Sequence, residues 1–539
     1  MNYLKSFYSN TFFLLTLLIF SYFSYAFHLL GSQTIPRAYQ VYNYKGTNTT
    51  IEFKEASKVD NICYYTGINK NAQLSFEQEE KNSWKKLFTT TKNVASFQWI
   101  CHDVNVTTQK IRFKLLEGQV MLNELRFSYK NSDINFTTSK KRLNDETNIK
   151  VSKSYYDNMV FDEIYHARTA YEIMRDIYPI YENTHPYLGK LIIMQGIKIF
   201  GMNPFGWRFS SVVFGALFIL MAYYFALKLF RRRLYALVSA FLVTFSFMHL
   251  TWSRLGLIDT FGVLFVFVSY YFFYVFIKKQ KLSWLLLSGV FFGLASAVKW
   301  SAVFASLGFV AMALYLLITH YPLKEKFQGY KLILYGLLSY AIVASTVYTL
   351  TFYDIYLKTG SLKAIWDYQV NMLAYHSHLV SSHPYSSAWW SWPFDIKPMC
   401  AYRNIEGTTF SSITMFGNPA IFWLGVVAML YLVYIFIKRR TLEGTLILFA
   451  FMALYLPYAF VGRVMFLYHY YYAVPFLILA IVYGIRDFLS FYPKQSILLW
   501  IYLAIVAGLF LAFYPVLSGY EVPKSYVDNY LLWLPTWWL

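Results

Sequence analysis

The chain has 539 residues, of which 57% are hydrophobic and only 14% are charged, and its mean hydropathy is +0.37. Because about a quarter of the residues in soluble domains are charged, this composition excludes a soluble enzyme, a disordered chain and a fibrous repeat, and it indicates a polytopic membrane protein. The formal net charge of +20 is typical of nucleic-acid binding or of cytoplasmic loops rich in Lys and Arg, and the positions of the charges decide between the two.

The first element is an apolar run at residues 11–30, which is long enough to cross a bilayer as a helix. A cleaved signal peptide is the alternative, because Ser24-Tyr25-Ala26 resembles a small-residue cleavage site. The run is longer than a typical signal core, so we expect residues 1–30 to hold an uncleaved first transmembrane helix.

Residues 31–150 form a polar insert. Short stretches such as 50–54 and 109–115 alternate between apolar and polar side chains, and turn-forming residues separate them. This pattern predicts an antiparallel β-sandwich. Cys63 and Cys101 both lie in the insert and could form a disulfide if it is extracytoplasmic; two buried thiols are the alternative. Their spacing does not fit a zinc or redox motif.

Residues 151–539 read as a membrane domain with two long outer loops, 151–205 and 351–418. Ten more apolar runs predict helices near 206–230, 234–252, 257–277, 283–300, 301–319, 332–350, 419–437, 443–460, 468–485 and 497–514. Together with the first helix they give about eleven spans.

Basic clusters occur in alternate connections between these predicted spans. With the N-terminus inside, the inside connections are 231–233, 278–281, 324–326, 438–440 and the segment from Arg486 to Lys494. Every compact basic cluster then falls on one side, which predicts a multi-pass plasma-membrane protein with a cytoplasmic N-terminus and an extracytoplasmic C-terminus. A nucleic-acid site would not alternate with the spans, so no nucleic acid is expected as a partner.

The densest polar segment, residues 157–190, supplies the first candidate site residues. Asp162, Glu163 and His166 open an amphipathic helix, and adjacent helical residues point about 100° apart, so the two carboxylates cannot both face one reacting atom. A helix lying on the bilayer with solvated carboxylates is the alternative. His185 and Lys190 follow beside a proline turn, which suits an anionic headgroup; a snorkelling lysine beside an incidental histidine is the alternative.

Ionisable and aromatic residues also gather on the predicted outer side. They are Arg208, Arg254, Asp259, His383, Tyr385, Trp392, Arg463, Tyr468 and His469. A structural Arg–Asp pair and an interfacial aromatic belt are the alternatives. Three histidines at 376, 378 and 383 invite a metal interpretation, but no zinc-type ligand spacing accompanies them, so we expect no metal site.

Phosphate-loop and dinucleotide motifs do not stand out, and no inner loop is long enough for an ATPase domain. Energy for chemistry must therefore arrive in an activated substrate that the membrane supplies.

Over residues 155–539 the chain resembles the protein O-mannosyltransferase family of lipid-carrier-dependent glycosyltransferases. The segments that carry the resemblance are Phe161-Asp162-Glu163, Thr184-His185-Pro186 with Leu188-Gly189-Lys190, Phe205-Gly206-Trp207-Arg208, Ser253-Arg254 with Ile258-Asp259, Val298-Lys299-Trp300-Ser301, His383-Pro384-Tyr385-Ser386-Ser387 with Trp392-Pro393, Gly417-Asn418-Pro419, and Arg463 with Phe466, Tyr468, His469 and Tyr470.

The resemblance implies a GT-C membrane fold of eleven helices that transfers mannose from a polyprenyl-phosphate donor to Ser or Thr hydroxyls of extracytoplasmic proteins, with inversion. Asp162 would then be the general base and Glu163 would orient the helix or the acceptor. The donor phosphate would meet Arg208, Arg254, Lys190, His185 and Arg463. Donor or acceptor would contact His166, Asp259, His383, Tyr385, Trp392, Tyr468 and His469. No cofactor is required, although a divalent cation could assist.

Two departures from the family pattern stand out. Tyr187 replaces the second proline of a common His-Pro-Pro motif, and loop 351–418 is too short for the β-trefoil module of eukaryotic members. The insert instead resembles the galactose-binding-like sandwiches of some bacterial relatives, which indicates a bacterial protein. A related transferase that glycosylates a lipid or a cell-wall polymer is the first rival. A transporter is the second, but no internal repeat supports it.

Overall fold

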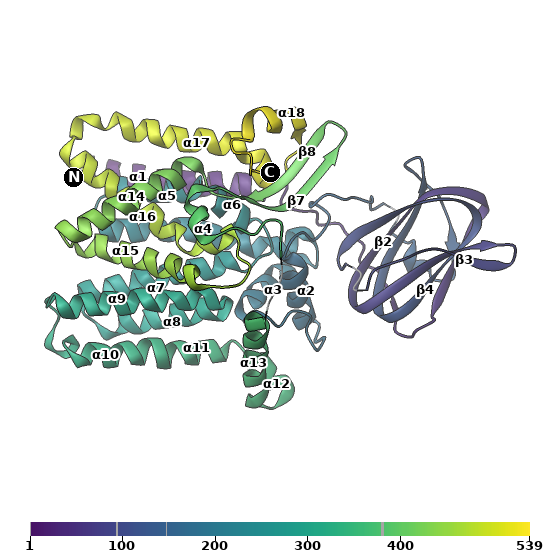
Figure 1. The fold of residues 1–539 in the computed structure, drawn as a ribbon, viewed down its shortest axis with the longest axis horizontal. Coiled ribbons are helices and arrows are strands. Elements are labelled where there is room, and N and C mark those ends of the chain that lie inside the picture. The colour runs from purple at the N-terminus through teal and green to yellow at the C-terminus, as the bar shows by residue number, and fades with distance from the viewer. Residues whose placement is uncertain (1, 93–94, 147, 379–381) are drawn as a thin grey trace. The chain divides into compact units, whose positions relative to one another are not determined.

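We describe the protein from a computed structural model, which covers residues 2–92, 95–146, 148–378 and 382–539. The chain divides into two compact units (Figure 1). Residues 30–176 and 197–207 form the sheet unit, and residues 1–29, 177–196 and 208–539 form the helical unit. Each is described by itself below.

The sheet unit is built on one antiparallel sheet whose strands are ordered β1-β4-β2-β3. Its strands are β1 (Gln40–Tyr42), β2 (Asn48–Glu80), β3 (Ser83–Thr89), β4 (Gln98–Tyr129), β5 (Ser132–Asp133) and β6 (Thr137–Thr138). The alternating pattern of the sequence thus does form the predicted sheet insert.

Strands β2 and β4 are long enough to fold the sheet around a core. The middle of β2 pairs with both arms of β4: Cys63 lies opposite Cys101 on one side and Arg126 on the other. The curled strands enclose a fully buried apolar core that includes Ile62, Leu74 and Phe113. Cys63 and Cys101 form a disulfide across the β2–β4 pair, so the structure decides between the two alternatives that the sequence left open.

Helix α2 (Glu163–Met174) packs on this sheet within the same unit. Its Arg168 donates to Glu172 at 3.0 Å, one turn along the helix, and to the main-chain oxygen of Asn69 in β2 at 2.5 Å. A buried guanidinium needs such partners, so Arg168 attaches α2 to the sheet.

The helical unit contains the apolar segments. Its helices and the short strands beside them are α1 (Asn2–Phe27), α3 (Leu188–Phe200), α4 (Pro204–Phe230), α5 (Arg233–Thr244), α6 (Phe247–Ser253), α7 (Asp259–Lys279), α8 (Leu282–Val298), α9 (Ala305–Ile318), α10 (Tyr330–Leu337), α11 (Ala344–Leu350), α12 (Tyr353–Thr359), α13 (Leu362–His378), β7 (Met399–Glu406), β8 (Thr409–Met415), α14 (Pro419–Lys438), α15 (Leu442–Tyr455), α16 (Val474–Phe491), α17 (Ile497–Ser518), β9 (Val522–Pro523) and α18 (Lys524–Tyr526). Helix α3 and the start of α4 continue into the sheet unit.

Among the described residues, 8 helices are long and apolar enough to cross a membrane, α5 and α6 form a pair bent by 60°, and residues 11–27 and 282–298 form shorter apolar helices. Each of these segments overlaps one of the spans predicted from the sequence. The boundaries differ at the bend after Thr244 and at residues 467–472, where a 3-10 turn precedes α16. Pro475 in the first turn of α16 suits a helix start, because its missing N–H has no partner there in any case.

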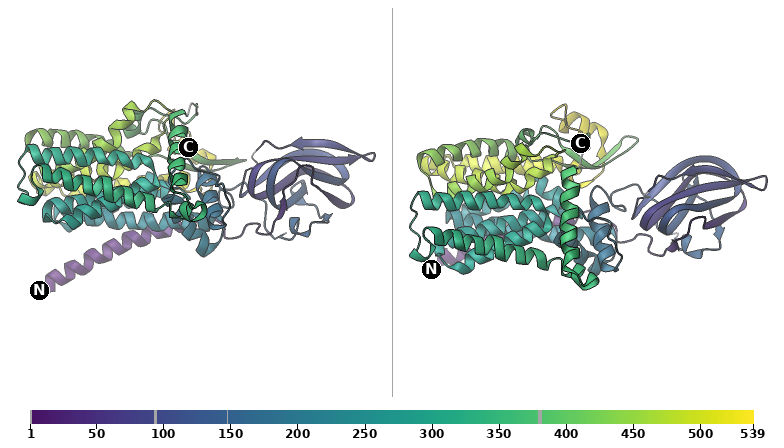
Figure 2. Two further views of the ribbon diagram at one scale, coloured as in Figure 1. Left: turned by 90° about the horizontal axis from the view of Figure 1, so that it is seen from below. Right: turned by 60° about the horizontal axis from the view of Figure 1, so that its bottom comes forward.

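The two ends of the helical unit differ in charge and content. The basic turns between α4 and α5, α7 and α8, and α14 and α15 lie at the end where α1 starts (Figure 1). Helices α12 and α13 and the β7–β8 hairpin lie at the opposite end, and α13 runs across the direction of the spans (Figure 2). The polar side chains described next belong to this second end.

A cationic cavity with an apolar groove beside it

A cavity of about 510 Å³ opens at the second end of the helical unit. Segments far apart in the sequence line it: Thr184, His185, Pro186, Lys299, Trp300, Ser301, Val303, Phe304, His376, Tyr458, Val461, Arg463 and His469. Among the described residues, the lining includes two cations and three imidazoles but no carboxylate, so the cavity suits an anion.

Lys299 reaches the cavity from the position directly after α8. Its extended backbone separates α8 from the 3-10 turn Trp300–Phe304. The ammonium donates to Asp259, the first residue of α7, at 2.8 Å, and lies 4.9 Å from the ring centre of Tyr468. Asp259 is almost fully buried, so its carboxylate holds Lys299 in place. The Tyr468 ring also contacts the ammonium of Lys299 through a cation–π interaction.

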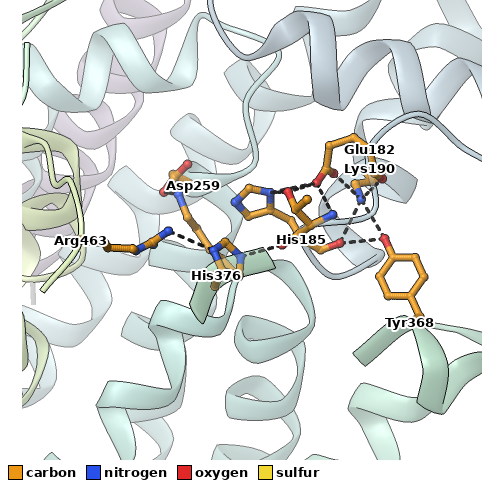
Figure 3. Close-up of polar contacts among 9 residues, drawn as sticks. Glu182, His185, Lys190, Asp259, Tyr368, His376 and Arg463 are labelled. Carbon is orange, nitrogen blue, oxygen red and sulfur yellow. Dashed lines mark hydrogen bonds and ion pairs between the residues drawn. The ribbon is translucent and has the colours of Figure 1, made fainter. Parts of the chain in front are cut away.

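His376 of α13 connects two walls of the cavity (Figure 3). Its Nε2–H donates to the Thr184 carbonyl oxygen at 2.8 Å, and its Nδ1 accepts from Arg463 Nη1 at 3.0 Å. Burial lowers the pKa of His376 to about 4, and the hydrogen bond to Thr184 opposes this only in part. The imidazole is therefore neutral near pH 7 and orients the Arg463 guanidinium.

A buried network fixes the turn that carries His185 (Figure 3). The Glu182 carboxylate lies 3.1 Å from His185 Nδ1 and 2.5 Å from Lys190 Nζ, and it pairs with both groups. Lys190 also donates to the carbonyl oxygens of Glu182 and His185, at 2.8 and 3.0 Å, and lies 3.1 Å from the Tyr368 hydroxyl. These partners engage the fully buried ammonium, so its role in the structure is to hold residues 182–190 together.

An apolar groove of about 560 Å³ lies next to the cavity and shares Phe304 and Val461 with it. Its remaining lining comes from α9, α15 and the turn after α15: Leu307, Ala311, Phe449, Met452, Ala453, Leu456, Pro457 and Phe460. Leu307 is 52% exposed and Phe460 89%. Polar cavity and apolar groove together match an amphiphile with an anionic head.

Some of the predicted aromatic residues line the cavity, whereas others pack behind its wall. His469 lines the cavity, and burial lowers the pKa of its imidazole well below the usual range. Trp392 is fully buried, stacks on His469 with ring centres 5.9 Å apart and donates to the Ser387 hydroxyl at 3.0 Å. His383 and Tyr385 lie beside each other on the more exposed part of the loop.

Two of the predicted phosphate ligands lie in buried positions. Arg254 donates to the carbonyl oxygens of Ala26, His28, Leu29 and Ser518, at 2.6 to 3.1 Å. It thereby joins the end of α1 to the end of α17, which is a structural task. Arg208 is fully buried in the second turn of α4. That either arginine binds a phosphate stays a prediction.

The predicted carboxylates belong to the sheet unit. Asp162 precedes the first residue of α2 and is half-buried. Its main-chain oxygen accepts from the N–H groups of Tyr165 and His166, each at 3.0 Å. Glu163 is buried, and its Oε2 accepts from the Val160 N–H at 3.0 Å. This hydrogen bond ties Glu163 to the residues just before α2. The orienting role of Glu163 and the catalytic role of Asp162 both stay predictions.

Two family models match the chain. Residues 184–349 match the dolichyl-phosphate-mannose-protein mannosyltransferase model, and residues 361–537 match the C-terminal four-transmembrane region of protein-O-mannosyltransferase. The chain belongs to the protein O-mannosyltransferase family. Membership makes it a mannosyltransferase and confirms the resemblance that the sequence motifs carried.

Individual relatives agree with this assignment. The polyprenol-phosphate-mannose–protein mannosyltransferase of Mycobacterium tuberculosis is 24% identical over 70% of this chain and 86% of its own length. The enzyme of that name from Corynebacterium glutamicum is 26% identical over 70% of this chain and 88% of its own. The S. cerevisiae Pmt1-Pmt2 complex bound to the sugar donor matches with a TM-score of 0.62, at 14% identity, over 70% of this chain and 89% of that chain. This match confirms the fold expected for the family.

Lys299 and His376 line the cavity but were not among the predicted site residues. Lys299 lies in the Val298-Lys299-Trp300-Ser301 segment that carried the resemblance, where a cation next to an outer span end was the available signal. His376 was noted only as a possible metal ligand. Nothing in the sequence pairs it with Thr184 or Arg463, because those contacts join positions far apart in the chain.

Proposed function

We propose that the chain transfers a mannosyl residue from a polyprenyl-phosphate donor to Ser or Thr hydroxyls of extracytoplasmic proteins, with inversion at the anomeric carbon. Its partners are then the lipid-linked donor, an acceptor protein or peptide, and the bilayer. The named relatives, which are polyprenol-phosphate-mannose–protein mannosyltransferases, support the donor and the protein acceptor.

The observation that carries the proposal is the pairing of the cationic cavity with the apolar groove. The cavity offers Lys299 and Arg463 to a phosphate, while the adjoining groove offers only apolar side chains such as Leu307 and Met452 to a hydrocarbon chain. A soluble nucleotide sugar has no use for the groove, whereas a polyprenyl-phosphate sugar needs both parts.

The reaction is a single displacement. The acceptor oxygen bonds to the anomeric carbon while the bond from that carbon to the phosphate oxygen breaks, and the electron pair leaves with the phosphate. Lys299, held by Asp259 at 2.8 Å, and Arg463, held by His376 at 3.0 Å, are cations set before the reaction, as stabilisation of the departing phosphate requires. We add Arg208 to these two cations, because it lies in the Phe205-Gly206-Trp207-Arg208 segment that carries the family resemblance.

The acceptor hydroxyl must lose a proton as it attacks. Asp162 is proposed as the base that takes this proton, a role worth roughly 10²–10⁴-fold in rate. Phosphate is already a good leaving group, so no strong general acid and no cofactor are needed. If no cofactor is needed, transfer to a short peptide acceptor should persist in excess EDTA.

The proposed location is a bacterial plasma membrane, with the N-terminus cytoplasmic and the cavity and C-terminus extracytoplasmic. Two observations support it. The basic turns gather at the end of the helical unit where α1 starts (Figure 1), whereas the cavity is lined by His376 of α13 from the other end. The Cys63–Cys101 disulfide is typical of an oxidising compartment.

The test is transfer in proteoliposomes from labelled polyprenyl-phosphate-mannose to a Ser/Thr peptide. Asp162→Asn should abolish transfer while protein level and donor binding stay near wild-type. Asp176→Asn, an exposed carboxylate just after α2, is the matched control and should transfer normally. Wild-type turnover by Asp162→Asn would refute its role as the base.

The acceptor class is tested separately by mass spectrometry of extracytoplasmic proteins and glycolipids with and without the gene. Loss of hexose from Ser/Thr peptides supports the proposal. An unchanged proteome with altered glycolipids would instead assign the chain to the lipid-glycosylating rival.

A further inference from the structure

A cluster of three carboxylates lies in the sheet unit. Glu124 belongs to β4, and Asp145 and Glu146 follow the short 3-10 turn Lys141–Leu143. One ligand oxygen from each residue lies within 4.8 Å of the others. The cluster therefore joins the return strand of the insert to the segment by which the chain leaves it.

Glu124 is the unusual member, because its side chain is 0% exposed. One carboxylate oxygen, Oε1, accepts from the Arg126 guanidinium. The other, Oε2, is buried and has no hydrogen-bond partner among the described residues. Buried carboxylate oxygens normally have partners, so Oε2 faces a place where a partner is expected.

The charges in the cluster do not balance. The pKa of Glu124 is raised to about 7, chiefly by burial, which outweighs the lowering by Arg126; the charges of Asp145 and Glu146 act in the same direction as burial. Arg126 is the one cation that contacts the cluster among the described residues, and it also donates to the Glu146 main-chain oxygen at 2.8 Å. Three carboxylates and one guanidinium leave two negative charges when all are ionised.

Glu146 is already held in place by the chain that enters the insert. Its Oε2 accepts from the backbone N–H groups of Arg37 and Ala38, at 2.6 and 3.2 Å. The carboxylate thus has a fixed direction before any ligand binds. The segment that enters the insert at Arg37 and Ala38, strand β4 and the segment that leaves the insert at Glu146 therefore meet at this point.

We propose that Glu124, Asp145 and Glu146 bind one Ca²⁺ ion, which joins the entry and exit segments of the insert to strand β4. The ligands are all oxygens, as hard divalent cations prefer. Ca²⁺ accepts irregular oxygen sites at about 2.3–2.6 Å, which suits three carboxylates from two separate segments, whereas Mg²⁺ demands a near-ideal octahedron and retains water. A divalent charge also neutralises the cluster.

The test uses the full-length protein in detergent, freed of metal with chelator and titrated with CaCl₂ by calorimetry. The expected result is one Ca²⁺ per chain, weaker binding of MgCl₂, and slower proteolysis within residues 31–150 when Ca²⁺ is present. Absence of stoichiometric Ca²⁺ binding would overturn the proposal. Tighter binding of Mg²⁺ would overturn the choice of ion.

The decisive variant is Asp145→Asn, because Asp145 is exposed and its replacement should leave the fold intact. We expect it to weaken Ca²⁺ binding at least roughly tenfold, since ligand charge sets affinity at such sites. Asp133→Asn, an exposed aspartate in β5 of the same sheet, should bind like wild-type.

Glu124→Gln is the second variant and should lose Ca²⁺ binding. If it does not fold, Asp145→Asn decides alone. Wild-type affinity in Asp145→Asn, with the protein folded, would refute the site.

Discussion

The helical unit and the sheet unit treat buried charge in opposite ways. In the helical unit the buried cations Lys190 and Arg254 are surrounded by oxygens of the protein. Lys299 and Arg463 face a cavity, and each is held by one hydrogen-bond partner among the described residues. In the sheet unit the cluster of Glu124, Asp145 and Glu146 carries the excess negative charge, and one oxygen of Glu124 has no hydrogen-bond partner among the described residues.

The difference shows that the type of residue is a weaker guide to function than the number of its partners. A cation whose hydrogens all meet protein oxygens stabilises the fold. A cation with one partner beside a cavity is available to a ligand, and so is a buried carboxylate with an unused oxygen. The following variants test this distinction.

Lys190→Met should give the largest effect on stability. Lys190 is fully buried and pairs with Glu182 at 2.5 Å. Removing one member of a buried pair leaves the other charge uncompensated, at a cost of about 3–5 kcal/mol. Thermal unfolding in detergent measures the loss.

The double variant Lys190→Met/Glu182→Gln is the control for that experiment. It should recover part of the stability, because the unpaired carboxylate is gone. If Lys190→Met unfolds like wild-type but binds donor poorly, Lys190 is a phosphate ligand rather than a structural clamp.

Replacing the disulfide tests whether the two units are stabilised independently. Cys63 and Cys101 are 38 residues apart in the sequence, and losing such a link typically costs about 2–4 kcal/mol. Cys63→Ser/Cys101→Ser should make the sheet unit markedly more sensitive to protease. Thermal unfolding of the helical unit should stay unchanged; a matching loss in both units would show that they unfold together.

The sequence predicted the span order because each span is a local apolar run. All eleven apolar segments of the structure overlap predicted ones, and the main departures are the bend after Thr244 and the 3-10 turn at 467–472. The alternation around residues 50–54 likewise predicted strands, but not that β2 and β4 are each more than 30 residues long and pair at two places.

The site was harder to predict because its contacts join distant segments. His185, Arg463 and His469 were expected in the site and do line one cavity. Lys190 and Arg254 carry the same charge as Arg463, and only the structure shows that carbonyl oxygens surround them. Sequence patterns give residue types and spacing, whereas the partners of a buried cation depend on tertiary packing.

Arg463→Gln tests a cation for which His376 is the one anchoring partner among the described residues. Arg463 is half-buried and lines the cavity, so its loss should leave unfolding nearly unchanged while donor affinity falls roughly 10–100-fold, about 1.4–2.7 kcal/mol. The donor affinity is measured by binding of polyprenyl-phosphate-mannose to the detergent-solubilised protein. Arg403→Gln, an exposed arginine on β7, is the control and should bind donor normally. Equal affinities in both variants would remove Arg463 from the site.

The smallest expected effect is a pH dependence at His376, whose imidazole orients Arg463. Burial lowers its pKa from the usual 6.5 to about 4, so between these pH values the unfolded chain binds more protons than the folded one. Stability then rises with pH across this window and is lost as the pH falls from 6.5 to 4. The variant His376→Gln lacks this group, so its melting temperature should fall less than that of wild-type between pH 7 and pH 4.5. Other buried groups such as His469 are common to both proteins and cancel in the difference. Parallel pH profiles would contradict the lowered pKa of His376, because they would show that its imidazole takes up protons equally in the folded and the unfolded chain.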